Sequence, residues 1–162
     1  MSMPEDSDAA GAGQRPPLTP EQLTALTASL FEGHIGLQFS EIGADRVRAN
    51  LTIRPELCQG TGVTHGGVYC SMSESVASMG ASIALNGKGY AVGINNNTDF
   101  LRATRDGVLT AEGTPVFRGR QQQLWRVVIT GSDGRECAQA HVRLQNVMVD
   151  PAEALQIGRP LI

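Results

Sequence analysis

The spacing of hydrophobic residues changes between two periods along the chain. After a glycine-rich segment at residues 59–67, apolar side chains recur at the spacing of one helix face: Val68, Met72, Val76, Met79 and Ile83. No proline interrupts the chain between residues 64 and 115, and the Asn-Gly-Lys-Gly sequence at residues 86–89 is a good C-terminal stop. The pattern predicts one long helix that starts at the paired glycines and ends near these residues.

Alternation with a period of two predicts strands on both sides of this helix. Residues 39–53 alternate apolar and polar positions, as a strand with one buried face does. Four more strand-like runs follow the helix, at residues 90–102, 108–117, 124–130 and 135–149, and Pro115 marks an irregular position in the second. Because short turns join consecutive strands, we expect an antiparallel sheet. An α+β fold, with a five-stranded sheet curled around the long helix, satisfies both patterns.

The two ends of the chain carry weaker patterns. Residues 1–18 are small and polar and predict a disordered tail. Thr19 is a candidate N-cap, with Pro20 at the first helical position and Gln22 three residues after the cap, so a short helix is expected to about residue 31. We therefore expect a single domain at residues 19–150 and a C-terminal tail at residues 151–162.

Composition excludes several classes of protein. The net charge is −3, which disfavours a general nucleic-acid binder but leaves room for a local cluster of arginines. The three cysteines are an odd number without the spacing of a disulfide framework or a zinc site, so we expect free thiols and no metal. Neither a membrane-spanning run nor a signal pattern is present in the sequence, and a cytoplasmic location without membrane partners is expected.

The start of the long helix carries the candidate chemistry. The backbone N–H groups of Gly66 and Gly67 have no partner inside the helix and point out of its positive end, where an oxygen developing negative charge is stabilised. Glu74 and Ser78 stand one turn apart, away from the apolar stripe. Taken singly, a helix Glu is usually solvated and a His-Gly-Gly sequence is usually a turn. Their combination in one segment is unusual.

These residues carry a resemblance to a known family. Gln59, His65, Gly66, Gly67 and Glu74 stand at the spacing of the signature of hotdog-fold acyl-CoA thioesterases. The branch is that of the 4-hydroxybenzoyl-CoA and 1,4-dihydroxy-2-naphthoyl-CoA thioesterases, with the phenylacetate-pathway (PaaI-type) thioesterases as close relatives. Ser78 matches the family's small hydroxyl residue one turn after the Glu, and the likeness extends over residues 33–149.

The resemblance implies a hotdog fold, in which two subunits pair their sheets edge to edge and the dimers stack into homotetramers. It also implies that the helix Glu of one subunit faces the glycine-rich loop of the other. The implied reaction is hydrolysis of an acyl-CoA thioester to a free acid and CoA, without a cofactor, since CoA is part of the substrate.

Roles for the site residues follow from the same resemblance. The Gly66 N–H would polarise the thioester carbonyl, and Glu74 would act either as nucleophile or as general base, a choice that the sequence leaves open. Gln59 would position groups near the thioester. His65 would hold the loop in place or assist the leaving group, and the first role is favoured. Ser78 would hold a water molecule or Glu74, although a small residue chosen for packing explains it equally well.

Substrate binding is expected to involve residues outside this motif as well. The candidates are Gly67, Asn97, Phe100, Arg118, Gly119 and Arg120. The two arginines would contact the phosphates of CoA. Asn97 would line the acyl pocket, and Phe100 would be a pocket wall or a core residue. Some members of the branch that act on aromatic acyl groups carry a histidine near Phe100, so the resemblance does not extend to a hydroxylated aromatic substrate.

Two other functions compete with this one. A non-catalytic acyl-CoA sensor is a binding protein on the same fold, although the segment before Thr19 is too short and too acidic for a DNA-binding region. A hotdog hydratase or dehydratase would pair its His and its acid in a different motif context. The sequence therefore favours thioester hydrolysis over both.

Overall fold

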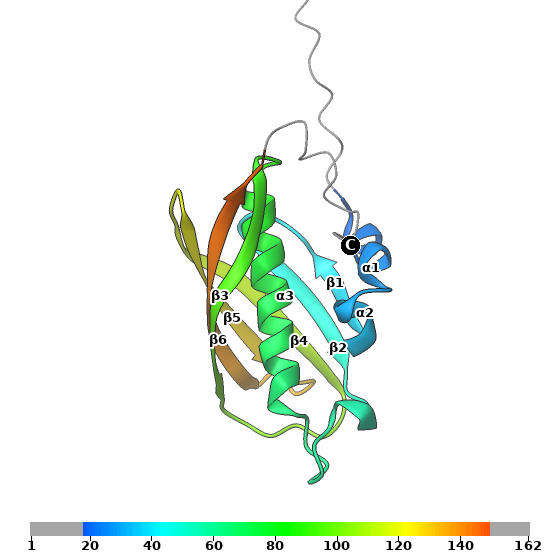
Figure 1. Cartoon of the computed structure of the whole chain (residues 1–162). Coiled ribbons are helices and arrows are strands. Elements are labelled where there is room, and N and C mark those ends of the chain that lie inside the picture. Colours follow the sequence, from blue (N-terminus) through cyan, green and yellow to red (C-terminus); the bar gives the residue numbers. More distant parts are fainter. Residues whose placement is uncertain (1–17, 150–162) are drawn as a thin grey trace, which may run out of the picture.

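The computed structural model describes residues 18–149, so the two expected tails lie outside the described residues except for Leu18. The described elements follow the order α1 (Pro20–Thr27), α2 (Phe31–Ile35), β1 (Leu37–Glu41), β2 (Val47–Thr52), a 3-10 turn (Pro55–Leu57), α3 (Gly66–Ala84), β3 (Gly89–Phe100), β4 (Val108–Arg118), β5 (Gln122–Thr130) and β6 (Glu136–Met148). All strand pairs are antiparallel, in the order β1-β2-β4-β5-β6-β3. Figure 1 shows this sheet curled around α3, which confirms the predicted α+β architecture.

The sheet has six strands and not the predicted five. The alternating stretch at residues 39–53 was expected to be one strand, but it lies in two strands, β1 and β2, that pair with each other. A turn at residues 42–46 separates them, and Arg46 Nε donates a 2.7 Å hydrogen bond back to Glu41 Oε1 across it. Because the turn falls within an alternating pattern, periodicity alone does not reveal it.

The N-terminal helix is shorter than predicted. Thr19 caps α1 in the expected capping box with Gln22, but α1 ends at Thr27 and a second helix, α2, begins at Phe31. Gly36 ends α2 in the left-handed conformation, with a φ of 81°. The two helices lie beside β1 at one side of the sheet (Figure 1).

The apolar stripe of α3 packs into the concave face of the sheet. Its members Val68, Met72 and Val76 are buried, as the helical spacing predicts. The closest approach of helix and sheet is at Gly80, where an added Cβ would lie 2.3 Å from Cη2 of the fully buried Trp125. Only a glycine lets the helix lie this close to the ring.

A buried polar network anchors the C-terminal end of α3. Trp125 Nε1 donates to Gln123 Oε1 at 3.1 Å, and Gln123 Nε2 donates to the Ala81 carbonyl at 3.0 Å and to Asn146 Oδ1 at 2.9 Å. Asn146 Nδ2 donates in turn to the carbonyls of Gly119 and Arg120. The β4–β5 turn is therefore fixed to the helix through side chains that lie between them.

One long strand is left at the edge of the sheet. β3 (Gly89–Phe100) pairs with β6 on one side only, and most of its side chains are exposed. Exposed apolar residues follow this edge: Val92, Ile94, Phe100 and Leu101. A long apolar edge strand is a template for pairing with another strand.

No helix among residues 18–149 has the length and hydrophobicity needed to cross a bilayer.

Candidate functional site

The loop before α3 folds onto itself and delivers His65 to the helix start. Gln59 N–H donates to the Val63 carbonyl at 2.9 Å, and Gly62, with a φ of 75°, donates to the Gln59 carbonyl at 2.8 Å. His65 N–H donates to the Leu57 carbonyl at 2.9 Å, which ties the end of the loop to its beginning. The glycine-rich sequence thus forms a hydrogen-bonded turn that holds His65 in place at the start of α3.

His65 is the N-cap of α3, and its ring takes one of the free helix donors. Its Nδ1 accepts a 2.9 Å hydrogen bond from Gly67 N–H, so the neutral ring carries its hydrogen on Nε2. Val68 N–H donates to the His65 carbonyl. Within residues 18–149, Gly66 N–H donates no hydrogen bond. Of the two glycine donors in the predicted pair, Gly66 is therefore the one that stays open for a substrate oxygen.

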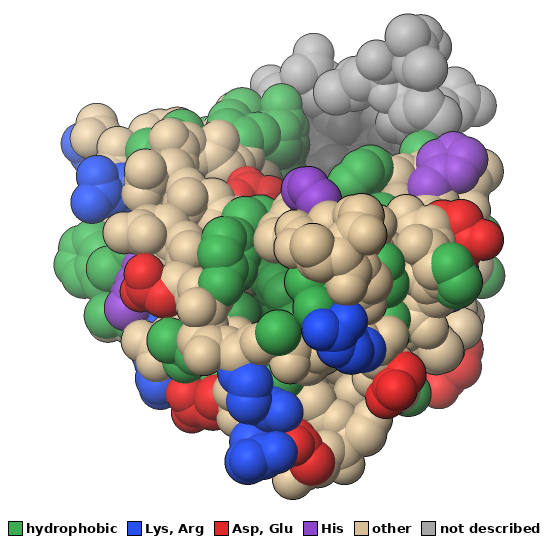
Figure 2. Space-filling view, turned by 90° about the horizontal axis from the view of Figure 1, so that it is seen from below, with side chains coloured by type: hydrophobic (Ala, Val, Ile, Leu, Met, Phe, Trp, Pro, Cys, Tyr) green, Lys and Arg blue, Asp and Glu red, His purple; other side chains and the backbone are tan. Residues whose placement is uncertain are grey.

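A pocket of about 280 Å³ opens at this donor. It is lined by Gln59, Val63, Thr64, Gly66, Tyr69, Phe100, Leu101, Arg102 and Ala103. The Phe100 ring covers Gly66 closely, since an added Cβ there would lie 2.9 Å from Phe100 Cζ. Figure 2 views the molecule from this end and shows hydrophobic side chains that reach the surface between polar and charged ones. Gln59 and Gly66 of the motif thus meet Phe100, which lies outside the motif, in one pocket.

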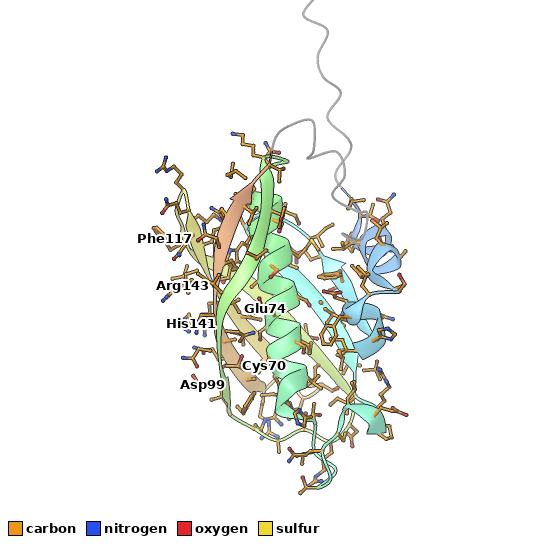
Figure 3. The ribbon with its side chains drawn as sticks, viewed as in Figure 1. Cys70, Glu74, Asp99, Phe117, His141 and Arg143 are labelled. Carbon is orange, nitrogen blue, oxygen red and sulfur yellow. The ribbon has the colours of Figure 1, made fainter. Side chains whose placement is uncertain are left out.

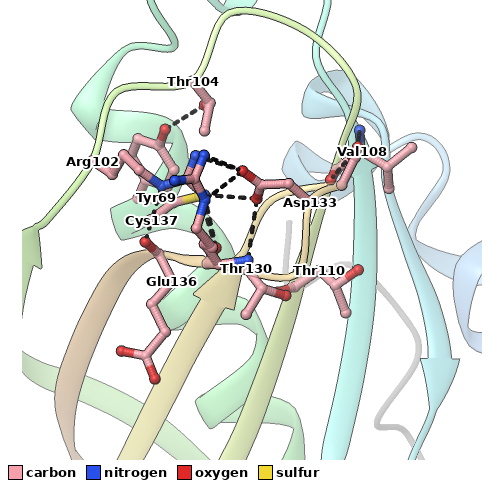
Figure 4. A network of polar contacts seen from close by, with 11 residues as sticks. Tyr69, Arg102, Thr104, Val108, Thr110, Thr130, Asp133, Glu136 and Cys137 are labelled. Atoms are coloured by element: carbon pink, nitrogen blue, oxygen red, sulfur yellow. Dashed lines mark hydrogen bonds and ion pairs between the residues drawn. The ribbon is translucent and has the colours of Figure 1, made fainter.

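The wall of this pocket is held by a hydroxyl network, of which Figure 4 shows the bond between Tyr69 and Thr104. Tyr69 and Thr104 share a 2.6 Å hydrogen bond, and Thr104 and Thr64 share one of 2.9 Å. Thr64 and Thr104 are buried, and Thr64 N–H also donates to the Thr104 carbonyl. The network fastens the segment after β3 to the loop before α3.

Arg102 fastens the same segment to the β5–β6 turn. Its guanidinium binds both carboxylate oxygens of Asp133, at 2.9 and 3.0 Å, and donates to the Arg135 carbonyl (Figure 4). The pKa of Asp133 is lowered to about 2, first by hydrogen bonds from the backbone and side chain of Arg135 and then by Arg102. Burial raises the pKa of the neighbouring Cys137 thiol. Arg102 is therefore engaged in an ion pair that shapes the pocket rim.

Glu74 lies further along α3, half-buried against β3. Asn96 Nδ2 donates to Glu74 Oε2 at 3.0 Å. Eight residues of helix separate Glu74 from Gly66, which is a rise of about 12 Å. A single thioester carbonyl therefore cannot touch both groups of one subunit. Ser78, one turn beyond Glu74, makes no hydrogen bond to it in the described part of the chain.

Other predicted site residues lie apart from this pocket. His65 and Gly67 line a separate hollow of about 310 Å³ beside Phe31 and Ile35 of α2. Asn97 pairs with His141 and stands on the outer face of the sheet, whereas its neighbour Asn96 faces α3. In Figure 3, His141 projects from the outer side of the sheet, away from α3.

The predicted CoA-binding turn lies at the opposite end of α3. Arg118 is ion-paired to Asp45 at 2.9 Å and lies 5.6 Å from the centre of the Trp125 ring. Gly119 and Arg120 line a pocket of about 620 Å³ together with Lys88. This pocket is next to the last turn of α3, so about 28 Å of helix separates it from Gly66 of the same subunit.

Two residues of interest were not found from the sequence. Lys88 adds a second cation to the pocket of Arg120, but it was interpreted only as part of a helix stop. Asn96 contacts Glu74, but the alternation of strand residues does not show which asparagine of the run at residues 95–97 faces the helix.

Comparisons with known proteins identify the family of the chain. The family model described as the thioesterase superfamily matches residues 61–138. "Putative esterase Rv1847" of Mycobacterium tuberculosis is 51% identical over 124 residues, which make up 75% of this chain and 89% of that protein. 1,4-dihydroxy-2-naphthoyl-CoA hydrolase of Escherichia coli K12 is 26% identical over 125 residues, or 77% of this chain and 92% of the relative.

A solved structure extends the likeness to the whole described fold. The thioesterase HI1161 of Haemophilus influenzae superimposes with a TM-score of 0.78 at 29% identity, covering 82% of this chain and 93% of that one. Its fold, the family model and the relatives at high coverage all point the same way. The chain belongs to the thioesterase superfamily, has its hotdog fold, and is a hydrolytic enzyme that acts on thioesters.

Proposed function

We propose that the protein hydrolyses acyl-CoA thioesters in a site that two subunits share. The observation that carries the proposal is the position of the two chemical groups on α3. Gly66 offers an open N–H and Glu74 a fixed carboxylate, but about 12 Å of helix lies between them. Two copies of the helix in opposite directions would bring one group of each kind together.

The free edge of β3 supports such an arrangement. Antiparallel pairing of β3 with its copy is two-fold symmetric, so the partner's α3 runs in the opposite direction. With the axis next to Asn97, Phe100 of one subunit stands opposite Ile94 of the other. The pocket that contains Gly66 of the first subunit then lies at the level of Glu74 of the other subunit. This dimer would also cover the exposed apolar residues along β3.

The same symmetry places cations near the substrate. With Glu74 at the level of the partner's Gly66, the C-terminal end of α3 extends about 15 Å past the partner's open N–H, and Arg120 and Lys88 lie at that end. Cations there suit the phosphates of CoA. Arg118 already pairs with Asp45, and its contribution to this site is to hold the turn. Stacking of two dimers into a tetramer, as in the branch that the sequence resembles, is part of the proposal.

The chemistry follows from the two groups. Gly66 N–H stabilises the negative charge that develops on the carbonyl oxygen. Glu74 either attacks the carbonyl carbon, which releases the CoA thiolate and leaves an anhydride for water to hydrolyse, or takes a proton from a water molecule that attacks directly. Both routes give a free acid and CoA and need no cofactor.

One substitution removes the proposed oxyanion donor without a change in helix hydrogen bonding. Gly66 is the first residue of α3, where proline is well tolerated because its N–H has no helix partner. His65 precedes it with a φ of −66° and a ψ of 138°, which suits a residue before proline. Gly66→Pro should lower kcat about 100-fold to 1,000-fold. Gly66→Ala adds the same Cβ next to Phe100 but keeps the N–H, and it is the control for that contact.

The test measures CoA release with a thiol-reactive dye on benzoyl-CoA and hexanoyl-CoA. Glu74→Gln and Gly66→Pro are each expected to abolish most of the turnover. Mixed dimers of the two variants should regain activity, because one of their two sites then has a native Glu74 and a native Gly66. No regain in mixed dimers would contradict the shared site. If the wild-type protein bound CoA but released none from either substrate, the proposed acyl-CoA hydrolysis would be wrong and an acyl-CoA sensor would be favoured.

A further inference from the structure

The carboxylate of Glu74 occupies a space that only a glycine leaves free. A Cβ at Gly93 would lie 1.6 Å from Glu74 Oε1 and 2.7 Å from its Cδ. Gly93 has no positive φ, so its backbone does not require a glycine. The absent side chain therefore matters for the room that it gives to Glu74.

Asn96 holds the other oxygen of the same carboxylate. Its Nδ2 donates at 3.0 Å to Glu74 Oε2 and at 3.0 Å to the Cys70 carbonyl, which is one turn earlier on α3. Both acceptors lack hydrogens, so they fix the nitrogen on the helix side. Thr98 Oγ1 donates at 2.7 Å to Asn96 Oδ1 and secures the other end of the amide. Figure 3 shows Cys70 and Glu74 on consecutive turns of α3 beside β3.

A β-bulge brings these residues onto one face. The pairing of β3 with β6 shifts between Gly93, opposite Leu144, and Asn95, opposite Arg143, so Ile94 is an extra residue. In a regular strand, positions 93 and 96 would point to opposite faces, because they are three positions apart and side chains alternate at every position. The bulge reverses the alternation, and Gly93 and Asn96 both face Glu74. Bulges often aim side chains next to active sites.

We propose that Gly93, Asn96 and Thr98 form a carboxylate cradle that positions Glu74 for reaction through Oε1. Oε2 is bound by Asn96, while Oε1 accepts no hydrogen bond from any of residues 18–149. Asn96 and Thr98 are positioning residues, since they act through Glu74 and do not touch the substrate. The cradle also selects side-chain length, because an Asp at position 74 would stop about 1.5 Å short of Asn96. This inference rests on the proposed function of Glu74.

Three variants test the cradle by CoA release with separate kcat and KM values. Asn96→Ala should lower kcat about 10-fold to 100-fold with KM within about twofold of wild type, because a hydrogen bond to a charged group is lost outside the substrate contacts. Thr98→Val should lower kcat less than Asn96→Ala, since the amide stays but is free to turn. Gly93→Ala should approach the loss of Glu74→Gln.

Asn95→Ala is the control, because it makes the same change on the outer face of the same strand. Urea unfolding and size-exclusion chromatography of each variant separate lost positioning from lost folding or assembly. In a Glu74→Gln background, Asn96→Ala should bring no further loss of kcat. An Asn96→Ala enzyme with the kcat of wild type would overturn the cradle but leave the proposed function intact. A wild type without turnover would overturn both. A rise in KM and a loss of stability, without a fall in kcat, would reduce Asn96 to a structural residue.

Discussion

Replacement of Gly80 by alanine tests how tightly α3 is set into the sheet. The added Cβ would lie 2.3 Å from Cη2 and 2.5 Å from Cζ3 of Trp125, closer than any real carbon contact. The ring is fully buried, and its Nε1 is hydrogen-bonded to Gln123, which is itself bound to the helix at Ala81. The indole therefore cannot turn aside without breaking this network.

Two effects of opposite sign decide the magnitude. Overpacking of a core costs about 1–3 kcal/mol, and the rigid ring places this site at the upper end, near about 3 kcal/mol. Alanine gains about 1 kcal/mol over glycine in a helix interior. The free energy of unfolding of Gly80→Ala should therefore fall by about 2 kcal/mol.

Urea unfolding followed by circular dichroism measures this difference at one fixed protein concentration, since assembly would shift the midpoint. Circular dichroism is preferred to tryptophan fluorescence, because Trp125 is the single tryptophan of the chain and is itself substituted in the comparison that follows. Trp125→Phe removes the ring atoms that clash, so Gly80→Ala should cost less in that background, by about 1–2 kcal/mol. Gly60→Ala is the control, since its Cβ would meet no atom within 4 Å.

Two results would refute this reasoning. The first is a Gly80→Ala protein at least as stable as wild type, which would mean that the sheet yields to the helix. The second is simple additivity of Gly80→Ala and Trp125→Phe, which would mean that the cost arises elsewhere.

Three further predictions concern the polar and thiol groups around the pocket. Asp133→Asn should lower the melting temperature at pH 7, because the folded protein stabilises the ionised carboxylate of Asp133. The difference from wild type should shrink as the pH falls from the ordinary pKa of 3.8 and vanish as it passes the folded-state pKa of about 2. An equal difference at pH 7 and at pH 2 would contradict this. Thr104→Val should cost about 1–3 kcal/mol by orphaning the hydroxyls of Tyr69 and Thr64, whereas Thr104→Ser should not, and equal stability of the two would contradict the network. In a thiol-dye assay, Cys137 should react only on unfolding while the other two cysteines react earlier, and three fast thiols would be the contrary result.

The elements with a strong period could be predicted from the sequence. The spacing of apolar residues identified α3, whose observed end at Ala84 is close to the predicted stop. The Thr19 capping box identified the start of α1, and Pro115 marked the irregular position that the structure shows as a bulge between Pro115 and Phe117. These features depend on neighbours in the chain, and local patterns record them.

The details that the sequence does not reveal depend on contacts between distant residues. A single extra residue at Ile94 reverses the faces of the strand, so the alternation that would place Asn97 toward the helix places Asn96 there instead. Arg118 is turned toward Asp45 by the curl of the sheet, 73 residues away in the chain. Neither a bulge nor a partner at that separation leaves a periodic signal.

The fastening of α3 at both ends has a consequence for motion. Tyr69 is hydrogen-bonded at the N-terminal end, and the Ala81 carbonyl and the Ser82 hydroxyl both accept hydrogen bonds at the C-terminal end. The helix can neither slide along its axis nor roll without breaking bonds at two distant places. Opening of the pocket for a bulky substrate must then come from the loop at residues 59–64 and the segment at residues 101–107. The backbone amides of α3 should therefore exchange their hydrogens slowly and together, whereas those of the segments at residues 59–64 and 101–107 should exchange faster.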